Sequence, residues 1–233
     1  MATILLTGAS RGIGAAARTL LEQAGHTVIG QSTAGAGGLI AADFAQPRAA
    51  DALWAQALDQ AGGRIDVLVN NAGVFEAAPI DDADGFASTW QRSIAINLQS
   101  AADLCRHAVL HFQQTGGGRI INVASRAGHR GDSPSHWHYA AAKGGMLAMT
   151  KTIARAYAAQ NILAFAISPG FTMTGMAEEY LSSRGGDKLL ADIPLGRVAM
   201  PEEVGEMIRW LASDAPASMT GATLDINGAS YVR

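Results

Sequence analysis

The chain alternates short β-rich runs with longer helical stretches over most of its 233 residues. Runs of β-branched and apolar residues predict strands at Thr3 to Leu6, Thr27 to Gly30, Leu39 to Ala42, Ile65 to Asn70, Arg119 to Ala124, Leu163 to Ser168 and Thr223 to Ile226. Apolar residues at helical spacing predict helices near Gly14 to Gln23, Pro47 to Gln60, Trp90 to Gln113, Tyr139 to Gln160 and Pro201 to Leu211. This alternation predicts a doubly wound α/β fold, in which a parallel sheet of about seven strands is flanked by helices on both faces.

Two connections depart from the alternation. The stretch Ser32 to Gly38 is too short and too rich in glycine for a full helix, so one crossover should be abbreviated. Residues 171–193 show no clean strand or helix period, and a stretch that long in a compact domain usually forms a lid or a binding loop. We therefore expect one domain over residues 1–233 with a lid-like substrate loop near 171–193.

Charge balance and cysteine content exclude several classes of protein. Lys and Arg number 17 against 20 Asp and Glu, and this balance disfavours nucleic acid, because phosphate binding needs a basic surface. The lone Cys105 excludes an internal disulfide and a cysteine-based zinc site, and fits a reducing cytosol. No apolar run approaches the ~18 residues of a membrane span, and Met1 to Thr7 lacks signal-peptide features. We expect a soluble cytoplasmic protein without membrane or nucleic-acid partners.

A glycine-rich loop follows the first predicted strand directly, with the sequence Thr7-Gly8-Ala9-Ser10-Arg11-Gly12-Ile13-Gly14. Gly8 permits a sharp turn, while Gly12 and Gly14 have no side chains to keep a diphosphate from the backbone N–H groups that open the next helix. A Walker A loop would need a Gly-Lys pair, which is absent here. A tight structural turn is the alternative. The loop predicts a dinucleotide site that uses Gly8, Ser10, Arg11, Gly12, Ile13 and Gly14.

The end of the second predicted strand indicates which dinucleotide binds. It contains no acid to hold the ribose 2'-hydroxyl and repel a 2'-phosphate. Arg11 can instead offer a cationic fork to a phosphate, and Ser32 and Thr33 can donate hydroxyl hydrogen bonds. We therefore expect NADP(H) over NAD(H), although Arg11 could be a solvated loop cation and the two hydroxyl residues ordinary turn formers.

Two further segments are assigned to the adenosine side of the cofactor. Asp43, with Phe44 beside it, can accept a hydrogen bond from the adenine amino group, or could equally be the N-cap of the following helix. Small residues in Asn71-Ala72-Gly73 come just after the fourth predicted strand, where the cofactor would lie. The alternative for this segment is an Asn-rich turn.

Tyr139 and Lys143 stand four residues apart, on one face of a predicted helix. A nearby cation favours the phenolate, so Lys143 is expected to lower the pKa of Tyr139 from near 10 and make it a general acid or base. An exposed helical pair without function is the alternative. Ser125 follows the fifth predicted strand and could hydrogen-bond a substrate oxygen. Asn97 interrupts an apolar helical run and could hold a water that relays protons toward Lys143.

With these motifs in order, the chain resembles the short-chain dehydrogenase/reductase family over essentially its whole length. The matching residues are Thr7 to Gly14, Asn70 to Gly73, the set Asn97, Ser125, Tyr139 and Lys143, the triplet Ser168-Pro169-Gly170, and the closing stretch Thr220 to Gly228. The resemblance implies a Rossmann-like fold and a homo-oligomer, either a dimer or a tetramer. An apolar stripe on the predicted Lys143 helix could form the subunit interface or pack on the sheet instead; it comprises Met146, Met149, Ile153 and Tyr157.

The resemblance also implies a mechanism, in which NADPH delivers hydride to a carbonyl carbon and Tyr139 protonates the oxygen. Ser125 would position that oxygen, Lys143 would hold the nicotinamide ribose, and Asn97 would support a proton relay. The remaining nicotinamide contacts would come from Pro169, Gly170 and Thr172. The implied function is an NADPH-dependent carbonyl reductase; the alternatives are a secondary-alcohol dehydrogenase and a catalytically silent NADP-binding regulator.

Within the family the chain is most similar to 3-oxoacyl-(acyl-carrier-protein) reductases, notably around Ile193 to Arg197 and at the C-terminus. Such reductases usually carry basic residues that dock the acidic carrier, but the matching stretches here are Gln114 to Gly117 and Ala159 to Asn161, which lack them. A free small ketone therefore competes with an acyl thioester as the expected substrate.

The stretch between Ser125 and Tyr139 holds three of the six histidines. A metal site made by His129, Asp132, His136 and His138 is disfavoured, because the hydride mechanism needs none, and we expect a polar pocket wall. Arg126 or Arg130 could pair with a substrate carboxylate or phosphate, or could be a solvated cation. An apolar lid is expected from Met173, Met176, Tyr180 and Leu181, so that the pocket would suit an amphipathic substrate.

Overall fold

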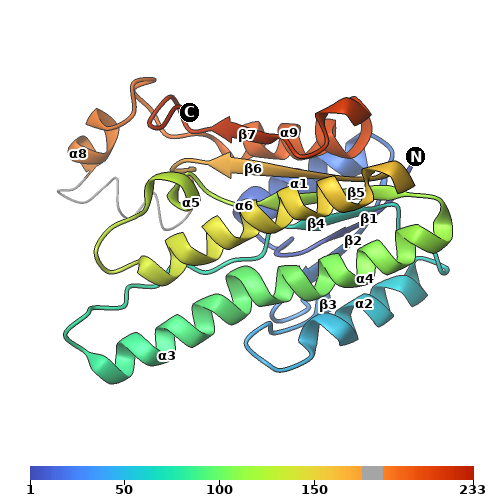
Figure 1. Cartoon of the computed structure of the whole chain (residues 1–233), viewed down its shortest axis with the longest axis horizontal. Coiled ribbons are helices and arrows are strands. Elements are labelled where there is room, and N and C mark those ends of the chain that lie inside the picture. Colours follow the sequence, from blue (N-terminus) through green and yellow to red (C-terminus); the bar gives the residue numbers. More distant parts are fainter. Residues whose placement is uncertain (175–185) are drawn as a thin grey trace.

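The computed structural model describes residues 1–174 and 186–233 and contains a seven-stranded sheet (Figure 1). The strand order is β3-β2-β1-β4-β5-β6-β7, and every neighbouring pair is parallel. The strands are β1 (Thr3–Leu6), β2 (Thr27–Ser32), β3 (Ile40–Ala41), β4 (Val67–Asn70), β5 (Gly118–Val123), β6 (Ile162–Pro169) and β7 (Thr223–Ile226). The predicted doubly wound α/β fold is confirmed.

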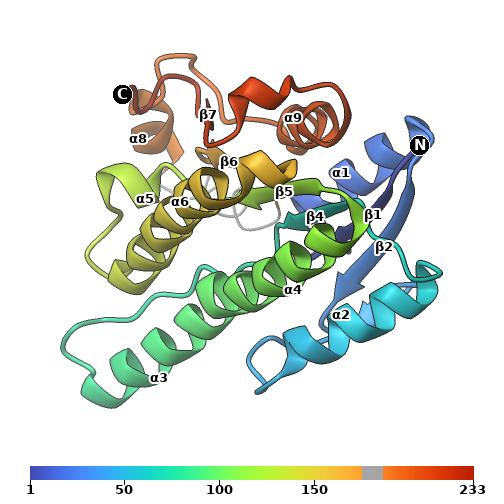
Figure 2. The same cartoon turned by 45° about the vertical axis from the view of Figure 1, so that its right-hand side comes forward.

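Helices cover both faces of the sheet (Figures 1 and 2). On one face α1 (Gly12–Gln23) packs beside α9 (Pro201–Ser213), and on the other lie α2 (Ala49–Gln60), α4 (Ser100–Thr115) and α6 (Trp137–Tyr157). The remaining helices of the described residues are α3 (Ala83–Ile94), a π-helical turn at Ala95–Gln99, α5 (Ala127–Arg130), α8 (Gly186–Ala191) and 3-10 turns at Ala158–Gln160 and Ala217–Met219. In the described part of the chain, no helix combines the length and apolar character needed to cross a bilayer.

The core explains why the central strands are almost entirely apolar. Along β1, Ile4 and Leu6 face α1 and α9, while Leu5 faces α2 and α4, and all three are fully buried. Alternate side chains of a strand point to opposite faces, so a sheet covered on both sides buries every position. The stripe on α6 also joins the core: Met146 and Ile153 are buried, and Met149 and Tyr157 pack partly buried against it. Burial within the chain, the second of the two interpretations, accounts for the stripe.

The strand order reverses between β1 and β4. From β1 the chain moves outward to β2 and β3, and β4 then returns to the opposite side of β1. In open parallel sheets, ligands bind beyond the carboxyl ends of the strands at such a reversal. The fold therefore brings the loop after β1, the loop after β4 and the segments after β5 and β6 to one edge.

The prediction of helices needs correction at one boundary and for two short helices. The helix expected near Trp90 begins at Ala83, because the Asp82 carboxylate accepts a hydrogen bond from Gly85 N at 3.0 Å and caps α3. The short helix α5 was not predicted, because four residues carry too little periodicity. Within residues 171–193, α8 forms where a loop was expected. The abbreviated crossover is confirmed, since β2 and β3 are joined without a helix.

Candidate active site

The glycine loop makes the close backbone contacts that its composition predicts. Gly8 has a φ of +67°, and a Cβ there would lie 2.9 Å from the Cα of Ala72. Gly14 packs so tightly that a Cβ would collide with the Gly8 carbonyl. The first turn of α1 contains no acid, and within the described residues no side chain caps its N-terminus. These N–H groups therefore present a positive helix end at the carboxyl edge of the sheet.

Side chains from β2 and β4 hold this loop in place. The Thr7 hydroxyl accepts hydrogen bonds from Asn71 N at 2.9 Å and Ala72 N at 3.0 Å, and the Asn71 amide donates back to the Thr7 carbonyl at 3.0 Å. Gln31, which is buried, accepts from Gly8 N at 2.9 Å and donates to the Ala42 carbonyl at 2.6 Å. Gln31 was missed in the sequence, where an amide inside a buried strand was the available signal.

The residues assigned to the adenosine side divide into two groups. Arg11 and Thr33 are exposed beside the loop, whereas Ser32 is buried and accepts a hydrogen bond from Gly35 N at 3.0 Å. Asp43 accepts from Ala45 N at 3.0 Å, in a turn six residues before α2 begins, so it is not the N-cap of that helix. Phe44 is buried in the core on the α2 side.

Tyr139, Lys143 and Ser125 lie together at the ends of β5 and α6. The Lys143 ammonium stands 5.7 Å from the centre of the Tyr139 ring and donates to the Val123 carbonyl at 2.9 Å. Ser125 lies close enough to the Tyr139 phenol to lower its pKa as a hydrogen-bonding neighbour. Asn97 reaches the same place, because a Cβ on Gly73 would lie 2.8 Å from Asn97 Oδ1 and 3.7 Å from Lys143 Nζ. The fold thus gathers all four predicted side chains.

Burial sets the ionisation of Tyr139 and Lys143. It raises the pKa of Tyr139 to about 12, against a smaller lowering by the Ser125 hydrogen bond, and it lowers the pKa of Lys143 to about 8. The expectation of a lowered phenol pKa is therefore wrong for the protein chain itself. The reason is that the ammonium donates to a backbone carbonyl, while loss of water penalises the phenolate more than its hydrogen bond stabilises it.

Asn97 occupies the π-helical turn between α3 and α4 and is fully buried. Its Oδ1 accepts from Val74 N at 2.9 Å, and its Nδ2 donates to the Val74 carbonyl at 3.0 Å and to Ser93 Oγ at 2.9 Å. Ser93 Oγ lies 2.8 Å from Nδ1 of His138, which is also fully buried. This link was not predicted, because Ser93 and His138 are 45 residues apart in the chain.

Comparison with known proteins identifies the family. A family model described as enoyl-(acyl carrier protein) reductase matches residues 8–229. The chain is 38% identical over 240 residues to cis-4-hydroxycyclohexanecarboxylate dehydrogenase of Sinomonas cyclohexanicum. The alignment covers 96% of this chain and 94% of that protein. It is 36% identical over 238 residues to a 3-oxoacyl-[acyl-carrier-protein] reductase of Thermotoga maritima, covering 96% and 95%. The chain belongs to the short-chain dehydrogenase/reductase family.

A third relative is named for a steroid substrate. The chain is 34% identical over 245 residues to 3beta-hydroxysteroid dehydrogenase 1 of Eggerthella lenta, covering 97% of this chain and 92% of that protein. These matches confirm the resemblance drawn from the motifs, including the similarity to 3-oxoacyl reductases. The protein is accordingly an oxidoreductase that depends on a nicotinamide cofactor.

The segment after β6 contacts the residues just before α9 and the glycine loop. Thr172 is buried and pairs with Ala199 in an isolated parallel bridge. Thr174 lies over the glycine loop, 2.9 Å from where a Cβ on Gly12 would stand. Met173 packs on a small core made by Leu189, Ile193 and Val198. The other three residues of the expected lid, Met176, Tyr180 and Leu181, lie outside the described residues.

An aromatic wall stands next to the phenol. Phe75 stacks on His136 with ring centres 3.8 Å apart. The rings of Phe75 and Tyr139 are nearly perpendicular, with their centres 4.9 Å apart. Phe75 was not predicted, because it sits in a loop without periodicity. Among the described residues, no group of three or more His, Cys, Asp or Glu is arranged to hold a metal ion.

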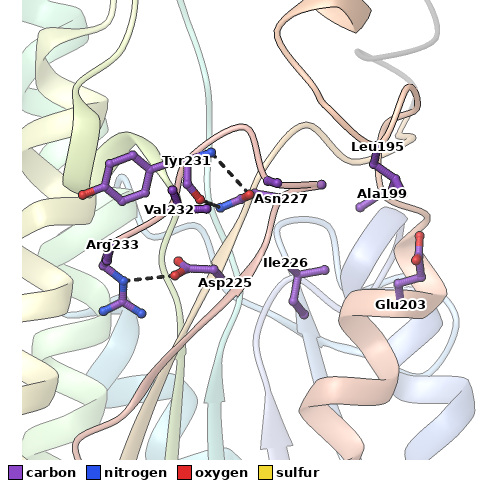
Figure 3. A pocket seen from close by; sticks show the side chains of 11 residues that line it. Leu195, Ala199, Glu203, Asp225, Ile226, Asn227, Tyr231, Val232 and Arg233 are labelled. Carbon is purple, nitrogen blue, oxygen red and sulfur yellow. Dashed lines mark hydrogen bonds and ion pairs between the residues drawn. The ribbon is translucent and has the colours of Figure 1, made fainter.

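A hollow of about 610 Å³ lies between the C-terminal segment and the start of α9 (Figure 3). Its charged side chains are already paired: Asp225 with Arg233 at 3.0 Å, and Glu203 with Arg197 at 2.7 Å. The Glu203 carboxylate also accepts from Met200 N at 2.7 Å and so caps α9. This hollow therefore has a structural explanation and lies apart from the glycine loop.

Proposed function

We propose that this enzyme reduces the carbonyl group of a small ketone with NADPH, using Tyr139 as the proton donor. The observation that carries the proposal is the convergence of Tyr139, Ser125, Lys143 and Asn97 at the carboxyl edge of the sheet. These residues come from three separate segments, and the glycine loop opens at the same edge. A catalytically silent binding protein would have no need of this arrangement.

The residues around the glycine loop fit a dinucleotide. The uncapped N-terminus of α1 suits the diphosphate, and Gly8 and Gly12 keep side chains away from it. Preference for NADP(H) is supported by the exposed Arg11 and Thr33 and by the uncharged end of β2. Ser32 accepts one hydrogen bond from Gly35 and keeps its own proton to donate.

The cofactor, when bound, supplies hydride to the carbonyl carbon. Ser125 would donate a hydrogen bond to the carbonyl oxygen and hold it near Tyr139. The pKa of Tyr139, raised to about 12, keeps the phenol protonated at neutral pH, so that its proton is available to the oxygen as negative charge develops there. Lys143, whose ammonium stands 5.7 Å from the centre of the Tyr139 ring, would then stabilise the resulting phenolate. Asn97 would support proton resupply.

The substrate is proposed to be a free small molecule. The relative from Sinomonas cyclohexanicum is named for a ring that bears a hydroxyl and a carboxylate. Docking of an acyl carrier is weakly supported, because the stretches 114–117 and 159–161 contain no basic residue. A ketone such as 4-oxocyclohexanecarboxylate is therefore a reasonable first substrate, beside acyl thioesters and hydrophobic ketones.

The test is NADPH oxidation with this panel by the wild-type enzyme and its Tyr139→Phe variant. Loss of the proton donor should lower kcat by about 10²- to 10⁴-fold. Tyr157→Phe, on the same helix but at its far end, is the matched control and should keep nearly full activity. Unchanged turnover by Tyr139→Phe, or no turnover of any ketone by the wild type, would contradict the proposal. Titration with NADPH and NADH separately tests the cofactor preference.

A further inference from the structure

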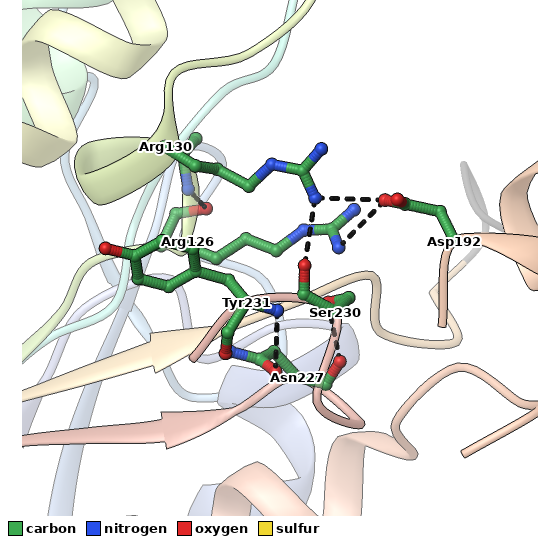
Figure 4. Close-up of polar contacts among 8 residues, drawn as sticks. Arg126, Arg130, Asp192, Asn227, Ser230 and Tyr231 are labelled. Atoms are coloured by element: carbon green, nitrogen blue, oxygen red, sulfur yellow. Dashed lines mark hydrogen bonds and ion pairs between the residues drawn. The ribbon is translucent and has the colours of Figure 1, made fainter. Parts of the chain in front are cut away.

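Two arginines stand at the two ends of α5: Arg126 directly precedes the helix and follows Ser125, and Arg130 is the last helical residue. Arg126 and Arg130 extend side by side toward Asp192, which lies after α8 (Figure 4). Arg130 Nη1 is 3.0 Å from Asp192 Oδ2 and donates to the Ser230 carbonyl at 3.0 Å. Arg126 Nη1 lies 3.5 Å from the same carboxylate oxygen, at the outer limit of a hydrogen bond. We call Arg126, Arg130 and Asp192 the arginine cluster.

The arginine cluster carries more positive than negative charge. Among the residues that the structure describes, the two guanidinium groups share the Asp192 carboxylate, and Asp132 acts on Arg126 only through space. The Arg126 side chain is only 11% exposed, so water cannot fully solvate its five N–H donors. Burial and the neighbouring Arg130 both lower its pKa, which reflects an incompletely balanced charge. A second carboxylate would complete this balance.

Arg126 directly follows Ser125 in the chain. Arg126 N donates to the Pro169 carbonyl at 3.0 Å, and its guanidinium stands 5.3 Å above the centre of the Phe171 ring. Arg126 therefore lies between Ser125 and the segment after β6. The position is rigid, because a Cβ on Gly128 would stand 2.7 Å from the Lys143 backbone, where α5 packs on α6.

We propose that Arg126, supported by Arg130, binds a carboxylate carried by the carbonyl substrate at a distance from its reacting carbon. The proposal names the substrate class and rests on the proposed function for the reaction itself. A guanidinium can bind a carboxylate through two parallel N–H donors, which orients as well as attracts it. Asp192 is 48% exposed, and water weakens ion pairs of such exposure, so Asp192 is an easily replaced partner.

A purely structural ion pair is the competing explanation. The direction in which two substitutions change ligand binding distinguishes it from a carboxylate site. If the cluster only ties α5 to the residues after α8, Arg126→Gln and Asp192→Asn break the same contact and change ligand binding in the same direction. If the cluster binds a substrate carboxylate, Arg126→Gln removes the binding group, whereas Asp192→Asn removes a competitor. The two variants should then change carboxylate binding in opposite directions.

Binding is measured first, by calorimetry with cyclohexanecarboxylate and cyclohexanecarboxamide on the enzyme saturated with oxidised cofactor. We expect the carboxylate to bind at least about tenfold more tightly than the amide, Arg126→Gln to remove that difference, and Asp192→Asn to strengthen carboxylate binding about twofold. Arg209→Gln, which removes an equal charge on α9, is the control and should leave the difference intact. Equal binding of both ligands by the wild type, or weaker carboxylate binding in Asp192→Asn, would overturn the proposal.

Kinetics then separate this inference from the proposed function. The ratio of kcat/KM for 4-oxocyclohexanecarboxylate to that for its methyl ester should fall about tenfold or more in Arg126→Gln, with Arg126→Lys between it and the wild type. Reduction of the ester in preference to the acid would overturn the inference and leave the proposed function standing. Selective carboxylate binding without reduction of any ketone would contradict the proposed function and support the inference.

Discussion

On the α6 side of the carboxyl edge, Asn97, Ser93 and His138 form a buried chain of uncharged hydrogen bonds, whereas on the α5 side the arginine cluster is charged and partly exposed. Hydrogen bonds offset the cost of burying Asn97 and Ser93, so the first side can hold atoms in fixed positions. In the described part of the chain, Nε2 of His138 is buried without a partner. Charged groups at a partly wet rim can exchange partners. The difference suggests that one side fixes the reaction geometry and the other recognises what arrives.

Lys143 is the exception to this comparison, because it is a charge placed on the buried side. Replacing it with Met should lower kcat about 10²-fold or more, since the phenolate of Tyr139 loses its stabilising cation. Lys151→Met, which removes an exposed charge from the same helix, is the matched control and should have little effect. Equal activity of wild type and Lys143→Met would show that the buried charge has no part in the reaction.

The same variant has a pH signature. The pKa of Lys143 is about 8, below its ordinary 10.5, so the folded chain releases this proton at lower pH than the unfolded chain does. Stability from this group therefore rises as pH increases from 8 to 10.5. Urea unfolding from pH 7 to 10 should show the wild type gaining on Lys143→Met by up to about 3 kcal/mol. Parallel curves would refute a buried ammonium.

Removing Ser93 tests the uncharged side directly. Ser93→Ala takes a partner from Asn97 Nδ2 and from His138 Nδ1, both fully buried. An unsatisfied buried polar group costs about 1–3 kcal/mol, so the free energy of unfolding should fall by that amount. Ser88→Ala on the same helix removes an exposed hydroxyl and should change it by less than about 0.5 kcal/mol. If both variants unfold at the same urea concentration, the buried chain contributes no stability.

The smallest effect is expected from Arg11, an exposed cation in the glycine loop. Arg11→Ala should raise the Kd for NADPH about tenfold and leave that for NADH within about twofold, because only NADPH carries the 2'-phosphate. Arg18→Ala, which breaks an exposed pair with Glu22 at 2.8 Å on α1, serves as the control. Fluorescence titration with both cofactors measures the change. An equal loss for the two cofactors would assign Arg11 to the helix and not to the phosphate.

Local pattern was sufficient for much of the fold and the residue inventory. The alternation of strands and helices, the glycine loop after β1 and the spacing of Tyr139 and Lys143 are short-range properties, so they could be read without coordinates. Boundaries failed where a side chain decided them, as with Asp82 at the start of α3. Gln31 was missed because its bond joins β2 to Gly8 of the glycine loop, 23 residues away in the chain.

By itself, the sequence determined the order of the elements, the family and the types of residue that meet at the sheet edge. Only the tertiary structure decided the ionisation of Tyr139, because the pKa depends on how much water burial removes and on which group Lys143 contacts. It also decided that Arg126 and Arg130 share Asp192, more than 60 residues away. Electrostatic balance depends on distances in space, and separation along the chain does not report them.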